Sequence, residues 1–186
     1  SLGLVGSEMC IRDRFSGDSI PSGEGTYGAK EDTDWLAMYM SSSRNYAVMT
    51  ANALNADYHL FSQGGWGVYC GWDNDTRHNI PSRYEALCGL CGGEFNESLG
   101  VSKPYDFRSW VSDAIVVNLG TNDASAFEQP PFTILETGEI CKQRKNPDGT
   151  YNREDLLKFE QAVIDFLKML RKHNESSHLV CRLLLE

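Results

Sequence analysis

The sequence lacks a long hydrophobic run and is poor in basic residues. No apolar stretch approaches the roughly 18 residues that a membrane-spanning helix needs, so we expect no membrane span. Lysine and arginine number 17 against 26 acidic residues, which gives a formal net charge of -9 over 186 residues. An acidic chain without a basic stripe repels phosphates, so the composition argues against a nucleic-acid partner.

Cysteine motifs that bind metal are also missing. The chain has six cysteines, and only Cys88 and Cys91 form a C-x-x-C pair. A zinc ribbon needs a second such pair, so we expect no metal and only structural thiols, unpaired or locally bridged. Residues 23–28 match G-x-G-x-x-G but lack the flanking strand, helix and acidic residue of a dinucleotide site. We therefore expect no organic cofactor.

The length and the pattern of apolar residues predict one α/β domain. A chain of 186 residues can bury a sizeable core. Besides the strands we predict a helical turn at 35–40, a loop at 20–33, and two long irregular segments at 64–104 and 129–151. Strands and helices alternate, which predicts a three-layer α/β/α domain with a parallel sheet. The strands are expected at 10–15, 58–62, 114–119 and 178–185, and the main helices at 43–54 and from 152 onward.

Three short segments each follow a strand-like run and together suggest ester hydrolysis. They contain Ser19 after Gly-Asp, the pair Gly64-Gly65, and Asn122 in Gly-Thr-Asn-Asp. Ligands of open α/β sheets bind at the carboxyl ends of the strands, so we expect Ser19, Gly65 and Asn122 to converge there. Ester hydrolysis needs a nucleophile and donors for the oxyanion. Ser19 can attack, while a backbone N–H and the Asn122 amide can donate.

These three blocks resemble the SGNH (GDSL-type) hydrolases. The surroundings are similar to the acetyl-ester hydrolases of carbohydrate esterase family two, in Gly23-Glu24-Gly25, Trp66-Gly67-Val68-Tyr69 and Asn118-Leu119, and the similarity runs from about Phe15 to about Val180. The resemblance implies a flavodoxin-like SGNH fold that needs neither metal nor cofactor. It implies Ser19 as the nucleophile and the N–H groups of Ser19 and Gly65 with the Asn122 amide as the oxyanion hole. Asp18 is expected to hold its loop and not to act as the catalytic acid.

The substrate that the resemblance implies is an acetylated small molecule or polysaccharide. Trp66 and Trp72 can stack on a sugar face, or they can anchor the loop that carries them. Two other functions remain open. One is a carbohydrate-binding module of the same fold that does no chemistry, and the other is a lipase or lysophospholipase-type GDSL esterase. The acetylated sugar and the oligomeric state are left undetermined.

The histidine block of the family is absent from this sequence. Related proteins place the catalytic histidine in an Asp-x-x-His segment, and none of His59, His78, His173 and His178 has that context. We therefore expect residues 15–186 to be a hydrolase domain that lacks its last elements and is nearly inactive alone. His78, in the segment after the glycine block, is the first candidate if a base exists within the chain.

The first 14 residues are expected to be a non-native extension. Arg12-Asp13-Arg14 interrupts the apolar run before Gly17, and residues 6–14 resemble translated adapter sequence. The start of the chain is therefore uninformative about a leader. An extracellular location is favoured only if a signal peptide preceded this sequence.

Overall fold

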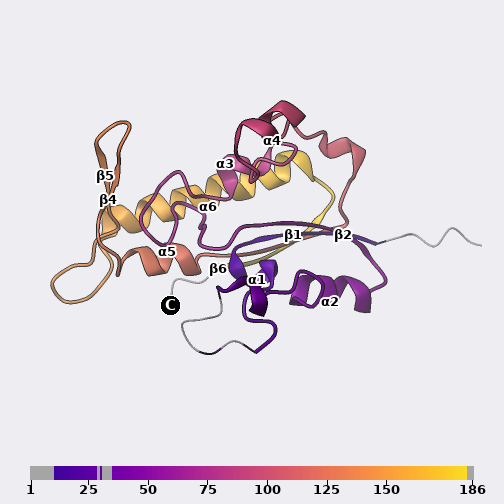
Figure 1. Cartoon of the computed structure of the whole chain (residues 1–186), viewed down its shortest axis with the longest axis horizontal. Coiled ribbons are helices and arrows are strands. Elements are labelled where there is room, and N and C mark those ends of the chain that lie inside the picture. Colours follow the sequence, from indigo (N-terminus) through magenta and orange to yellow (C-terminus); the bar gives the residue numbers. More distant parts are fainter. Residues whose placement is uncertain (1–10, 29, 31–34, 184–186) are drawn as a thin grey trace, which may run out of the picture.

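The centre of the molecule is a parallel sheet with helices on both faces (Figure 1). The computed structural model describes residues 11–28, 30 and 35–183, without the side chains of 182 and 183. The strand order is β2-β1-β3-β6, and every pairing is parallel. These strands are β1 (Arg12–Gly17), β2 (Asp57–Ser62), β3 (Ala114–Leu119) and β6 (His178–Leu183). The predicted parallel α/β fold is confirmed.

The register of the sheet brings three strand ends to one level. Gly17 at the end of β1 pairs with Ser62 on β2 and with Asn118 on β3. The chain therefore leaves these three strands side by side at the carboxyl edge. That edge carries the serine, glycine and asparagine segments.

Helix α6 covers one face of the sheet, and α2 covers the other (Figure 1). Helix α6 (Arg153–His173) buries Phe159 and Phe166 against Ile115 and Val117 of β3. Helix α2 (Tyr46–Ala53) instead packs Ala47 and Ala51 against Phe15 of β1. Because successive side chains of a strand point to opposite faces, the apolar run of β3 serves both layers.

Asparagine side chains set where these two helices begin. Asn45 accepts the N–H of Val48, and Asn152 accepts the N–H groups of Glu154 and Asp155. Such caps satisfy N–H groups that have no partner within the helix. The prediction that α2 begins at residue 43 was therefore wrong by three residues, because the cap at Asn45 precedes the first turn.

The long segments predicted as irregular contain short elements, so that prediction was wrong in part. Pro81 opens α3 (Pro81–Tyr84), where its missing N–H costs no helical hydrogen bond. Gly138, with φ of 72°, turns the hairpin between β4 (Phe132–Ile134) and β5 (Glu139–Cys141). In Figure 1 this hairpin projects beyond the start of α6. The remaining elements are α1 (Ser19–Ser22), η1 (Ala37–Tyr39), α4 (Glu94–Leu99), η2 (Phe107–Ser109) and α5 (Thr121–Ala126). Within the described ranges, no helix is long and apolar enough to cross a membrane.

The first strand differs from the sequence prediction, because it spans residues 12–17 and not 10–15. Residues 1–10 lie outside the described residues. The expected boundary of a non-native extension at residue 14 falls inside β1, where Asp13 and Arg14 are both buried. A central strand therefore carries two charged side chains in its interior.

Candidate active site

A cavity of about 830 Å³ lies at the carboxyl edge of the sheet. Ser19, Gly65 and Asn122 all line it, although they are far apart in the sequence. Trp72 lines the same cavity. The other lining residues, which sequence reasoning did not assign to the site, are Glu24, Trp35, Gly64, Ser125 and Gln129. Of these, Glu24 and Gly64 belong to blocks that resemble the esterase family.

Ser19 is held at the sharp turn from β1 into α1. A side chain at Gly17 would meet the Asn118 carbonyl oxygen at 2.7 Å, so the strand end must be glycine. Asp18 caps α1 by accepting the Ile20 N–H at 3.1 Å. The Ser22 hydroxyl donates to the Asp18 carbonyl at 2.7 Å. The turn therefore presents the first residue of the helix to the cavity.

Asp18 itself is buried beneath this turn. Burial raises the pKa of Asp18, although the hydrogen bond from the Ile20 N–H favours the ionised form. Its carboxylate does not line the cavity. This placement agrees with a role in holding the loop.

The loop that carries Gly64 and Gly65, called the glycine loop below, passes directly beside Ser19. A side chain at Gly64 would come within 3.7 Å of the Ser19 Cβ and 2.5 Å of the Glu24 carboxylate. Gly65 has φ of 78°, which L-residues rarely adopt, and a side chain there would meet Trp72 at 3.1 Å. Within the described chain, no acceptor takes the Gly65 N–H. This N–H is available to a ligand.

Asn122 reaches the cavity from the first turn of α5. Its Nδ2 donates to the Trp66 carbonyl oxygen at 2.9 Å, which orients the amide. An amide nitrogen carries two hydrogens, so one remains for a ligand. Next to it, Asp123 is buried and accepts the N–H groups of Val68, Tyr69 and Cys70. Burial raises the pKa of Asp123 to about 6, while those three bonds favour the carboxylate.

None of the four histidines lines the serine cavity. His59 stacks on Trp110, and burial, together with the charge of Arg14, lowers its pKa. His173 lies 2.6 Å from the Glu85 carboxylate, and His178 opens β6. The described residues therefore place no imidazole beside Ser19.

Trp66 and His78 line a neighbouring cavity of about 440 Å³. Their rings stack with centroids 5.1 Å apart, and His78 Nδ1 lies 3.7 Å from Asp75. Of the two tryptophans expected to contact sugar, only Trp72 lines the serine cavity. No three histidine, cysteine or carboxylate side chains that could hold a metal gather in the described part of the chain.

Comparison with known proteins links this site to a family. No family model matches the chain. An acetyl xylan esterase, Est2A, from the rumen bacterium Butyrivibrio proteoclasticus is 62% identical, with a TM-score of 0.88 over 92% of this chain and 46% of its own. A family two carbohydrate esterase with a carbohydrate-binding domain, from Corynascus thermopiles (Myceliophthora fergusii), is 27% identical, with a TM-score of 0.64 over 92% and 44%.

The chain is a relative of the family two carbohydrate esterases. The resemblance predicted from the three blocks is thereby confirmed. An acetylxylan esterase / glucomannan deacetylase from Cellvibrio japonicus is 29% identical over 125 residues, which are 65% of this chain and 32% of that protein. This chain therefore spans less than half the length of each of these proteins.

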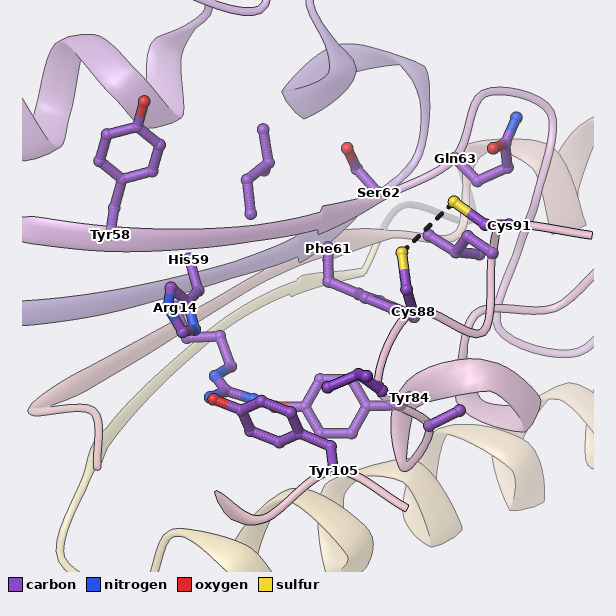
Figure 2. A pocket seen from close by; sticks show the side chains of 14 residues that line it. Arg14, Tyr58, His59, Phe61, Ser62, Gln63, Tyr84, Cys88, Cys91 and Tyr105 are labelled. Atoms are coloured by element: carbon purple, nitrogen blue, oxygen red, sulfur yellow. Dashed lines mark hydrogen bonds between the residues drawn. The ribbon is translucent and has the colours of Figure 1, made fainter. Parts of the chain in front are cut away.

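This chain also has a cavity of about 530 Å³ that lies against β2 (Figure 2). Figure 2 shows the Arg14 side chain reaching toward the rings of Tyr84 and Tyr105. It also shows the Cys88 and Cys91 sulfurs facing each other, 3.3 Å apart. Ser19 does not line this cavity, and among its described lining residues Ser62 bonds to Ser22 and Cys88 to Cys91, with no hydrogen bond from either to His59. We therefore assign the candidate chemistry to the Ser19 cavity.

Proposed function

We propose that the protein containing this chain is a serine esterase that removes acetyl groups from carbohydrate. The observation that carries this proposal is the single cavity lined by Ser19, Gly65 and Asn122. A nucleophile and two independent N–H donors at one cavity are what acyl transfer requires. The similarity of the chain to acetyl xylan esterases supports the same reaction.

In the proposed reaction, Ser19 Oγ attacks the acetyl carbonyl carbon and loses its proton to a base. The N–H groups of Ser19 and Gly65 and the amide of Asn122 hold the negative oxygen. The N–H of Ser19, at the start of α1, has no intrahelical partner. The sugar hydroxyl leaves with a proton, and water then attacks the acetyl group and frees acetate and Ser19.

No histidine is among the described residues that line the cavity. A serine hydroxyl is a weak nucleophile until a base accepts its proton. A histidine from another part of the protein would have to reach Ser19. The expectation that residues 1–186 alone are nearly inactive stays a prediction, and His78 would need to leave its stack on Trp66 to act.

An acetylated sugar suits the walls of the cavity. Trp72 and Trp35 line it and are 49% and 64% exposed. Aromatic faces of this kind pack on the apolar face of a sugar ring. Its described lining includes Glu24 but no lysine or arginine, which favours a neutral substrate over an anionic one. Stacking on sugar is therefore assigned to Trp72, while Trp66 contacts the neighbouring cavity.

The second candidate is a carbohydrate-binding module that does no chemistry. It is favoured by the absence of a histidine from the described lining of the cavity. Such a module would bind acetylated xylan through its tryptophans without releasing acetate. The two candidates therefore differ in one measurable product.

The test is acetate release from acetylated xylan by the full-length protein and two serine variants. Ser19→Ala is expected to abolish release. Ser125→Ala is the matched control, because Ser125 lines the same cavity but its hydroxyl donates to the Thr121 carbonyl. We expect this control to retain most activity. Binding of xylan by the unaltered protein without acetate release would instead establish the binding module.

A further inference from the structure

Two adjacent side chains of α5 form hydrogen bonds to the loop that carries Gly65. Asn122 donates to the Trp66 carbonyl at 2.9 Å. Asp123 accepts the N–H groups of Val68 and Tyr69 at 2.8 Å and of Cys70 at 3.1 Å. The loop is thus attached to one helix at two points, directly after Gly65.

The carboxylate of Asp123 is buried and closely fitted against the loop. Asp123 is 1% exposed. A carboxylate that accepts three successive backbone N–H groups fills a concave array of donors, and such charge-assisted bonds are strong. The carboxylate does not line the Ser19 cavity, so it has no direct contact with a substrate there.

Gly67 permits this approach. A Cβ at Gly67 would lie 2.3 Å from Asp123 Oδ2 and 2.3 Å from the Cys70 carbonyl oxygen. Only glycine leaves room for the carboxylate between the two chain segments. The glycine loop is therefore shaped around Asp123 as well as around Ser19.

We infer that Asp123 is a positioning residue for the oxyanion hole, on the basis of the function proposed above. Its carboxylate fixes the loop against α5, so that the Gly65 N–H and the Asn122 amide face the same oxygen. Without it, the Asn122 bond would be the remaining hydrogen bond between α5 and the described residues 65–70. A misplacement of about 1 Å in a catalytic group can cost on the order of 10²-fold in rate.

The inference is tested with kinetics of the full-length protein on an acetyl ester. Asp123→Ala removes all three acceptor bonds, and we expect kcat to fall about 10²-fold with KM changed by less than about threefold. Asp123→Asn keeps the oxygen that faces Tyr69 and Cys70 but turns a donor toward the Val68 N–H. We therefore expect it to lose less activity than the alanine variant.

Asp75→Asn is the control for a purely structural effect. Asp75 is also fully buried and lies in the same loop, but its carboxylate binds Arg77 and not residues 68–70. We expect this variant to lose stability while keeping kcat within about threefold. An equal fall in kcat for Asp75→Asn and Asp123→Asn would overturn the positioning role.

A second measurement does not depend on activity. In the folded chain, hydrogen exchange of the Val68, Tyr69 and Cys70 amides should accelerate at least about tenfold in Asp123→Asn, while α6 amides stay protected. Unchanged exchange would overturn the inference. The proposed function fails separately, if Ser19→Ala retains activity. If Ser19→Ala is inactive while Asp123→Ala keeps normal kcat, the esterase stands and the positioning role falls.

Discussion

Replacing Arg14 by methionine should stabilise this protein. Arg14 lies in the central strand β1 and is 5% exposed. Among the described residues, its Nε and Nη2 have no hydrogen-bond partner, and Nη1 reaches only the Tyr84 hydroxyl, at 3.4 Å. Methionine has a similar unbranched length and carries no charge, so it can fill the same space.

The expected gain follows from two opposing effects. An unpaired charge in the interior costs several kcal/mol in lost hydration. The guanidinium carbon lies 5.1–5.8 Å from the ring centres of Tyr84, Tyr105, Phe107 and Trp110, which offsets about 2 kcal/mol of that cost. Methionine also packs well on aromatic rings. We therefore expect Arg14→Met to raise the free energy of unfolding by about 1–3 kcal/mol.

Urea unfolding of the 186-residue chain measures this change. Arg12→Met is the control, because Arg12 is exposed on the same strand, and we expect a change within about 0.5 kcal/mol. A fall in the free energy of unfolding for Arg14→Met would refute the reasoning. It would mean that the ring contacts outweigh the lost hydration, and that a cation belongs in this strand.

Three further predictions concern the site and the core. Asn122→Ala should lower kcat of the full-length protein on an acetyl ester by about 10²–10³, as for one lost oxyanion donor, and near-normal turnover would remove it from the mechanism. Gly65→Ala should lower the free energy of unfolding by about 1–2 kcal/mol and reduce kcat, because φ is 78° there; thermal unfolding and turnover test this. Burial opposes ionisation of Asp155, but hydrogen bonds from Arg144 and Lys158 lower its pKa from 3.8 to about 2. The stabilisation that the Asp155 carboxylate contributes is therefore present above about pH 4 and is lost as the pH falls to about 2. Over this range the free energy of unfolding of Asp155→Asn should fall by about 2 kcal/mol less than that of the unaltered protein. Identical acid-unfolding profiles for the two proteins would contradict this prediction.

The sequence predicted the parts of the fold that depend on local patterning. The apolar run of β3 and the stripe of α6 were evident, because buried strands and amphipathic helices have distinct periods. The three blocks also identified residues that share one cavity, since parallel strands end at the same edge. Their chemical roles stay predictions until the variants are measured.

The remaining features depend on contacts between distant segments. The hydrogen bond from the Val68 N–H to Asp123 joins residues 55 positions apart, and no local pattern encodes it. The stacking of Trp66 on His78, outside the lining of the serine cavity, is likewise a contact that no local pattern encodes. The helical turn predicted at 35–40 is present as η1, but α1, α3, α4, α5 and the β4–β5 hairpin were missed because they have too few residues to show a period.

The central claim is that Ser19 is the nucleophile of an ester-hydrolysing site. It is tested most directly by treating the full-length protein with a serine-directed organophosphonate and locating the adduct by mass spectrometry. The account predicts one adduct on Ser19, with loss of acetyl-ester hydrolysis in proportion to labelling. Acetate release that persists after Ser19 is fully labelled, or an inactivating adduct on another residue, would contradict it.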